Sequence, residues 1–67
     1  MLESEAREGA QVIVTEVSDE KANLDWFGRQ GEIVMITPGM GLDDPIITVR
    51  DEEGEEEDFL PEELELA

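Results

Sequence analysis

Short β-branched runs, separated by glycine, proline and acidic residues, recur along this chain. The first run covers residues 10–17, where Val12 and Val14 fall on one face of an extended strand at a spacing of two. Runs of Ile, Val and Thr at 31–37 and 46–50 have the same character and are bounded by turn-forming residues. The pattern therefore predicts three strands before residue 51.

Turn signals divide the rest of the chain into a hairpin, a single turn and a last strand. Residues 51–54 predict a type I turn closed by Gly54 in the left-handed conformation, and residues 55–60 return as a fourth strand. Residues 61–64 predict one 3₁₀-like turn that begins at Pro61. Proline is favoured at the first position of a helical turn, where a backbone amide would have no hydrogen-bond partner. Residues 64–66 alternate and predict a short fifth strand.

These elements describe an all-β fold, a small five-stranded SH3-like barrel with a long connection at residues 18–30 and a short 3₁₀ turn before the last strand. We expect one barrel domain over residues 9–67, preceded by a flexible acidic tail at residues 1–8. Closing the sheet would remove both of its edges. The predicted core consists of Val12, Val14, Ile33, Ile36, Ile47, Val49, Phe59 and Leu64.

Charge is the property that most restricts the function of this chain. It carries 20 acidic residues against 4 basic ones, a formal net charge of −16 in 67 residues. Such a surface repels phosphate backbones, so we expect no direct binding of DNA or RNA. The chain has no apolar run long enough to span a bilayer and no leader-like N-terminus, which predicts a cytoplasmic protein without membrane contact, monomeric on its own.

The residue inventory argues against an enzyme. There is no His and no Cys, so a Ser or Thr nucleophile has no histidine base and a metal ion has no imidazole or thiolate ligand. The acidic run 51–58 does not match a calcium-binding loop, because Gly54 is its fourth rather than its sixth residue. We therefore expect no catalytic site, no cofactor and no dedicated metal site.

Apolar side chains in the two longer connections are candidates for contact with a protein partner. The candidate partner-binding residues are Leu24, Trp26, Phe27, Arg29, Met40 and Leu42. Trp is a frequent anchor of interfaces, but a small domain uses its few aromatic residues first for burial, so a plug at an open end of the barrel is the favoured alternative. Since adjacent residues point apart, one aromatic side chain could fill the core while the other faces outward. Met40 and Leu42 either extend an apolar patch beside them or simply pack against the sheet.

Four segments carry a resemblance to a known family. They are Gly9-x-x-Val12-x-Val14-Thr15, Gly28-x-x-Gly31-Glu32-Ile33-Val34, Pro45-Ile46-Ile47-x-Val49-Arg50 and Phe59-x-Pro61-Glu62-Glu63-Leu64. In these segments the chain resembles the SH3-like electron-transport accessory proteins, namely the variable chain of ferredoxin–thioredoxin reductase and the small E subunit of photosystem I. The resemblance implies a barrel that supports a redox-enzyme subunit or helps to dock ferredoxin. Because ferredoxin is itself acidic, this chain fits support of another subunit better.

Two functions from different classes follow. The first is a non-catalytic protein-binding or accessory-subunit module, whose partner is a redox-enzyme subunit or a basic protein. The alternative is an acidic nucleic-acid mimic that inhibits a DNA- or RNA-binding protein, which requires carboxylates in rows at phosphate-like spacing on one face.

The origin of the acidity is a separate question, compatible with either function. With Lys21 as the only lysine, the composition is typical of a surface adapted to high salt. Salt should then raise the midpoint of thermal unfolding, and mild acid should do the same at low salt by neutralising carboxylates that repel one another.

Overall fold

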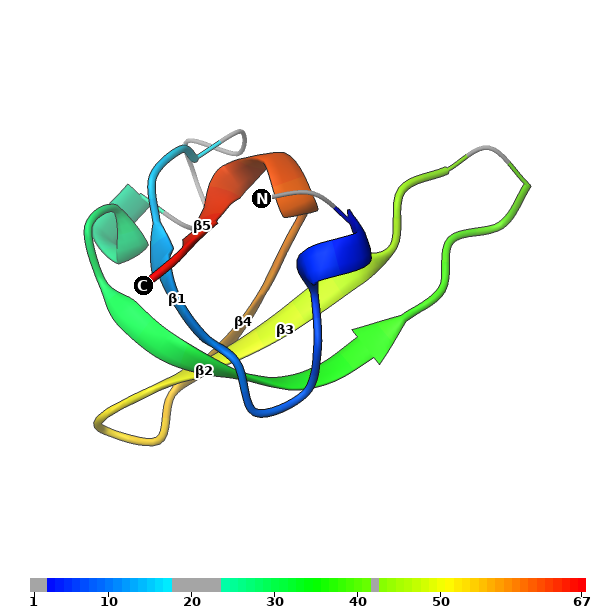
Figure 1. The fold of residues 1–67 in the computed structure, drawn as a ribbon. Coiled ribbons are helices and arrows are strands. Elements are labelled where there is room, and N and C mark those ends of the chain that lie inside the picture. The colour runs from blue at the N-terminus through cyan, green and yellow to red at the C-terminus, as the bar shows by residue number, and fades with distance from the viewer. Residues whose placement is uncertain (1–2, 18–23, 42) are drawn as a thin grey trace.

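Five antiparallel strands form a single sheet in the computed structural model, which describes residues 3–17, 24–41 and 43–67 (Figure 1). The strands follow the predicted runs to within a few residues and are β1 (Gln11–Val14), β2 (Gln30–Thr37), β3 (Ile46–Asp51), β4 (Glu56–Phe59) and β5 (Leu64–Leu66). Their order across the sheet is β4-β3-β2-β1-β5. The predicted all-β class is therefore confirmed.

Three short 3₁₀ segments connect or precede the strands, and they are η1 (Glu3–Glu5), η2 (Leu24–Trp26) and η3 (Pro61–Glu63). The described residues contain no helix long and apolar enough to cross a membrane. The turn predicted before the last strand is η3, in which the Leu60 amide donates to Glu63 Oε1 at 2.7 Å. The Glu63 carbonyl in turn accepts the Thr15 amide at 2.9 Å, so η3 ties the start of β5 to the end of β1.

β2 is the longest strand and contains an irregularity that sets which side chains face outward. Ile33 pairs with Val49 and Met35 pairs with Thr48. Val49 and Thr48 are consecutive in β3, so Val34 is an extra residue in β2 without a partner in the register. Such a bulge bends the strand and strengthens its twist. Beyond it, Ile36 faces the core opposite Ile47, whereas the neighbouring residue Met35 points to the outer face.

The core lies on the inner face of the sheet and agrees with the sequence prediction at all but one position. The buried apolar residues are Val12, Val14, Trp26, Ile33, Ile47, Val49, Phe59 and Leu64. Ile36 was predicted among them but is only half-buried, packed against this cluster next to the connection that follows β2. Trp26 takes the remaining place, and it closes the core from the side of η2.

The predicted closure of the sheet is not confirmed. No strand pairing joins β4 to β5 in the part of the chain that the structure describes. β4 and β5 follow each other in the sequence, with only Leu60 and the three residues of η3 between them. In the sheet, however, they are the two outermost strands.

The segment predicted as a tail makes contact with the body of the protein. Glu3–Glu5 form η1, and Ala6 is half-buried against the core cluster. The Gly9 amide then donates to the Ile33 carbonyl at 2.8 Å, which extends the contact between this segment and β2. The flexibility of residues 1–8 and the domain boundary at residue 9 stay predictions.

The hairpin between β3 and β4 has the predicted turn. The Gly54 amide donates to the Asp51 carbonyl at 3.1 Å, and Gly54 has a φ of +89°, a conformation that only glycine adopts without strain. The Asp51 amide donates to the Glu55 carbonyl at 2.9 Å. The turn holds Asp51 at the end of β3, where its side chain accepts a hydrogen bond from Arg29.

Candidate functional site

Trp26 is part of the core. Only 4% of its surface is exposed, and its ring meets that of Phe59 edge-on, with the centroids 5.6 Å apart and the planes at 65°. The guanidinium carbon of Arg29 lies 4.6 Å from the centroid of the Trp26 ring, within cation–π distance. The structure thus places Trp26 in the plug position, the alternative that the sequence favoured over an exposed anchor.

The remaining residues of the same connection are arranged differently. Phe27 is 65% exposed, which confirms the expectation that the two adjacent aromatic side chains point apart. Leu24 begins η2. Phe27 is therefore the one exposed aromatic side chain of the described part of this connection. Leu42, a candidate from the separate connection between β2 and β3, lies outside the described residues.

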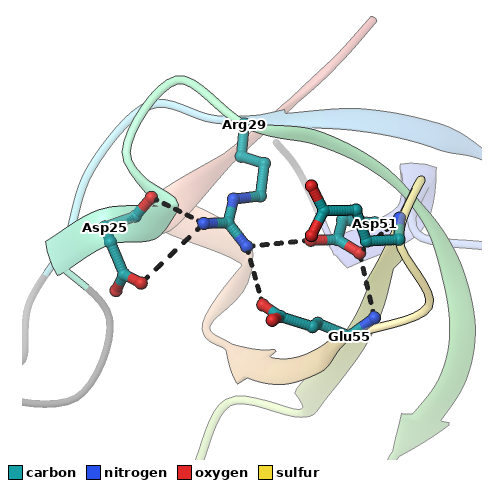
Figure 2. A network of polar contacts seen from close by, with 5 residues as sticks. Asp25, Arg29, Asp51 and Glu55 are labelled. Atoms are coloured by element: carbon teal, nitrogen blue, oxygen red, sulfur yellow. Dashed lines mark hydrogen bonds and ion pairs between the residues drawn. The ribbon is translucent and has the colours of Figure 1, made fainter.

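Arg29 links η2 to the β3–β4 hairpin (Figure 2). Its Nη1 donates to Asp51 Oδ2 at 2.8 Å and to Glu55 Oε2 at 3.0 Å, and its Nη2 donates to the Asp25 carbonyl at 3.2 Å. Burial of the guanidinium opposes its charge, but the hydrogen bonds to Glu55 and Asp51 outweigh that effect and raise the pKa of Arg29. Arg29 was a candidate for partner contact; here its terminal nitrogens bind within the chain.

Asp51 is the centre of this polar network. Its Oδ1 accepts the amides of Glu53 and Glu55, both at 2.9 Å, while its Oδ2 accepts Arg29, and only 4% of its side chain is exposed. Burial acts to raise the pKa of Asp51, but these three hydrogen bonds stabilise the carboxylate and leave the pKa below its ordinary value. Asp51 is thus ionised at neutral pH and fully engaged in holding the hairpin.

Substitution of Asp51 should separate the roles of its charge and of its hydrogen bonds. Asp51→Ala leaves the Glu53 and Glu55 amides without their acceptor, so we expect it to lower the midpoint of thermal unfolding by roughly 5–10 °C. Asp51→Asn keeps an acceptor for both amides and should lower the midpoint by less. Thermal unfolding followed by circular dichroism checks this order, and equal midpoints for Asp51→Ala and the wild type would contradict the role of Asp51.

The pH dependence of stability follows from the lowered pKa of Asp51. A carboxyl group with a lower pKa in the folded state stabilises the protein above its unfolded pKa, about 3.9 for Asp, and loses that contribution as the pH falls through the folded value. We therefore expect thermal stability to drop below a pH of about 4, and Asp51→Asn to reduce this drop. Unfolding midpoints measured from neutral to strongly acidic pH test it; identical acid limbs for Asp51→Asn and wild type would be inconsistent with the network.

A second group of apolar side chains gathers where β2, β3 and the residue after β4 meet. We call it the distal surface: Met40, Ile46 and Leu60 line it with the carboxylates of Asp43 and Asp44 at its rim, and we include Met35, which lies on the outer face of the adjoining strand β2. Met40 is 84% exposed, Met35 52% and Ile46 36%. Figure 1 shows that η2 and the connection between β2 and β3 lie at opposite ends of the molecule. Phe27 follows η2 and Met40 belongs to that connection, so the structure does not bring the two side chains together.

Sheet register explains why the distal surface is apolar. Ile47 and Phe59 pair on the inner face, which places the preceding and following residues, Ile46 and Leu60, next to each other. Thr48 lies between Met35 and Asp58 in the neighbouring strands, and its buried hydroxyl donates to Asp58 Oδ1 at 2.8 Å. Sequence reasoning found Met40 but missed the other three apolar residues, although the alternation around Ile47 already predicts that Ile46 faces outward.

The outer face of the hairpin does not present an uninterrupted row of carboxylates. Arg50 pairs with Glu32 on one side and Glu56 on the other in the sheet, and its Nη2 and Nε bind Glu56 Oε2 at 2.6 and 3.0 Å. On this face Arg50 interrupts the row of carboxylates that a nucleic-acid mimic requires; the mimic itself stays a prediction. Among the described residues, no cluster of three or more acidic side chains is placed to hold a metal ion.

Comparisons with known proteins add no relative. No protein-family model, curated protein or solved structure matches the chain.

Proposed function

We propose that this chain is a non-catalytic SH3-like module that binds a protein partner through the distal surface. Three features support an SH3-like barrel that is partly open: the antiparallel order β4-β3-β2-β1-β5, the bulge in the long second strand and the 3₁₀ turn before the last strand. Such a scaffold holds the β2–β3 connection on two hydrogen-bonded strands.

The observation that carries the proposal is that three of the five exposed large apolar side chains of the described residues belong to β2, β3 and the connection between these two strands. A small domain has few large apolar residues, and here Met35, Met40 and Ile46 remain outside the core. Contiguous apolar patches bordered by polar residues are typical of binding sites. The other two exposed apolar side chains are apart from this group: Phe27 follows η2, and Leu66 ends β5 at the far side of the strand order.

The polar network supports binding rather than chemistry. Groups with displaced pKa values often mark catalytic sites, because catalysis needs a group poised to exchange a proton. In the described part of the chain the displaced pKa values belong to Arg29 and Asp51, and each displacement stabilises the charged form. The two groups bind each other, so neither is poised as an acid or a base.

An accessory role beside a larger protein agrees with this surface. The net charge of −16 favours a partner with a basic docking face, and attraction between opposite charges accelerates association and excludes acidic competitors. The family resemblance implies a redox-enzyme subunit as the partner, and such a subunit with a basic docking face satisfies this requirement. We include salt adaptation in the same proposal, because an acidic surface can both attract a basic partner and remain hydrated at high salt.

Co-purification from cells that naturally make the protein tests the proposal. We expect the tagged wild-type chain to recover one protein in a fixed ratio, and Phe27→Ser to recover it equally. Met40→Ser should weaken the complex by about tenfold, which corresponds to a loss of about 1.4 kcal/mol of contact energy. Failure of the wild-type chain to retain any protein in a fixed ratio would overturn the proposed function.

A further inference from the structure

The distal surface contains a hollow with a mixed lining. Gly39, Met40, Asp43, Asp44, Ile46 and Leu60 surround it. Apolar side chains come from β3, from the β2–β3 connection and from the residue after β4, while the two carboxylates belong to the connection alone. An apolar hollow beside two negative charges is suited to a ligand that combines an apolar group with positive charge.

Electrostatics restricts which macromolecule can occupy this hollow. No Lys or Arg lines it, and Asp43 and Asp44 are both exposed. A second copy of this chain would bring another net charge of −16 to the contact, so repulsion opposes self-association. An acidic or neutral partner would leave the two carboxylates without a counter-charge. Charge complementarity therefore favours a basic partner.

We infer that the hollow receives one apolar side chain from a basic protein segment, whose neighbouring Lys or Arg residues pair with Asp43 and Asp44. This inference rests on the proposed function and names the chemistry of its partner. Met40 and Ile46 supply the contact that orders the apolar side chain, and the carboxylates select segments with positive charge on either side of it. Neither part suffices alone, because exposed ion pairs contribute little and an apolar contact of this size does not distinguish between partners.

A peptide titration followed by nuclear magnetic resonance tests the inference at the lowest salt concentration at which the chain is folded. The probe is a short peptide in which lysine alternates with leucine, and the control is a peptide of equal charge in which serine replaces leucine. We expect the leucine peptide to shift the amide signals of residues 39–41 and 43–46 and to bind about tenfold more tightly than the control.

Matched variants assign the two parts of the site. Met40→Ser should remove the advantage of the leucine peptide, whereas Phe27→Ser, an equal change at the other end of the molecule, should keep it. The double variant Asp43→Asn with Asp44→Asn should lose more affinity than Glu52→Gln with Glu53→Gln, which removes the same charge from the exposed hairpin turn.

Three results would overturn the inference: equal affinities for the two peptides, signal shifts centred on residues 51–58, or a dimer that forms through the distal surface. The proposed function is tested separately. If a partner co-purifies with the wild-type chain while the peptides show no preference, the inference fails and the proposed function stands. If no partner is retained but the leucine peptide prefers the hollow, the proposed function fails.

Discussion

Replacement of Trp26 with alanine should remove a large part of the stability of this protein. The substitution empties the side of the core that η2 closes, and it removes the edge-on contact with Phe59 and the cation–π contact with Arg29. Loss of a buried aromatic side chain costs about 3–5 kcal/mol. The total stability expected for a domain of this size is about 3–10 kcal/mol, so the change removes a large part of it or all.

Urea unfolding followed by circular dichroism measures this effect. The matched control is Phe27→Ala, an adjacent aromatic residue that is mostly exposed and should change the free energy of unfolding by no more than about 0.5 kcal/mol. Trp26→Phe keeps an aromatic ring against Phe59 and should fall between the two. If Phe27→Ala proved more costly than Trp26→Ala, the assignment of Trp26 to the core and of Phe27 to the surface would be refuted.

Salt should stabilise this protein more strongly than any single surface substitution. Its 20 acidic residues repel one another, and few cations offset them; Arg29 and Arg50 each bind carboxylates on the described surface. At molar salt the screening length falls to about 3 Å, so the repulsion between surface carboxylates largely disappears. We expect the midpoint of thermal unfolding to rise by roughly 8–16 °C between low and molar sodium chloride, equivalent to about 2 kcal/mol for a domain of this size.

Scanning calorimetry over a series of salt concentrations tests this expectation. The double variant Glu52→Gln with Glu53→Gln removes two exposed charges at the hairpin turn, so it should raise the midpoint at low salt and leave it unchanged at molar salt. Potassium chloride should act like sodium chloride if screening is the cause. A midpoint that is independent of salt would show that the acidity of the surface does not limit the stability of the fold.

Local patterns in the sequence were sufficient to predict the strands and their order of appearance. Alternation at Val12 and Val14 marks β1, and the glycine of residues 51–54 marks the hairpin that the structure contains. Pro61 marks η3 in the same way. These signals are local because strand periodicity and turn conformation depend on a few consecutive residues.

Long-range contacts could not be predicted in this way. Arg29 and Asp51 are 22 residues apart, and only the fold of the sheet brings them within 2.8 Å. The bulge at Val34 carries no residue that marks it, yet it determines that Met35 faces outward. Closure of the sheet was expected because it removes edges, but η3 separates β4 and β5 instead.

The candidate site was predicted only in part, for the same reason. Sequence reasoning grouped Trp26, Phe27 and Met40 because they are apolar and lie in connections. Trp26 is buried and Phe27 is exposed, while Met40 belongs to the connection between β2 and β3, which Figure 1 shows at the end of the molecule opposite to η2. Ile46 and Leu60 join Met40 through the register of β3 and β4, information that no single strand contains.

Photo-crosslinking in cells that naturally make the protein tests the central claim most directly. A crosslinking amino acid is placed at position 40 in one variant and at position 27 in another, both of which are exposed in the structure. The account predicts that position 40 captures one basic protein in high yield and that position 27 captures it weakly or not at all. Capture of the same protein at position 27 but not at position 40 would contradict the assignment of binding to the distal surface.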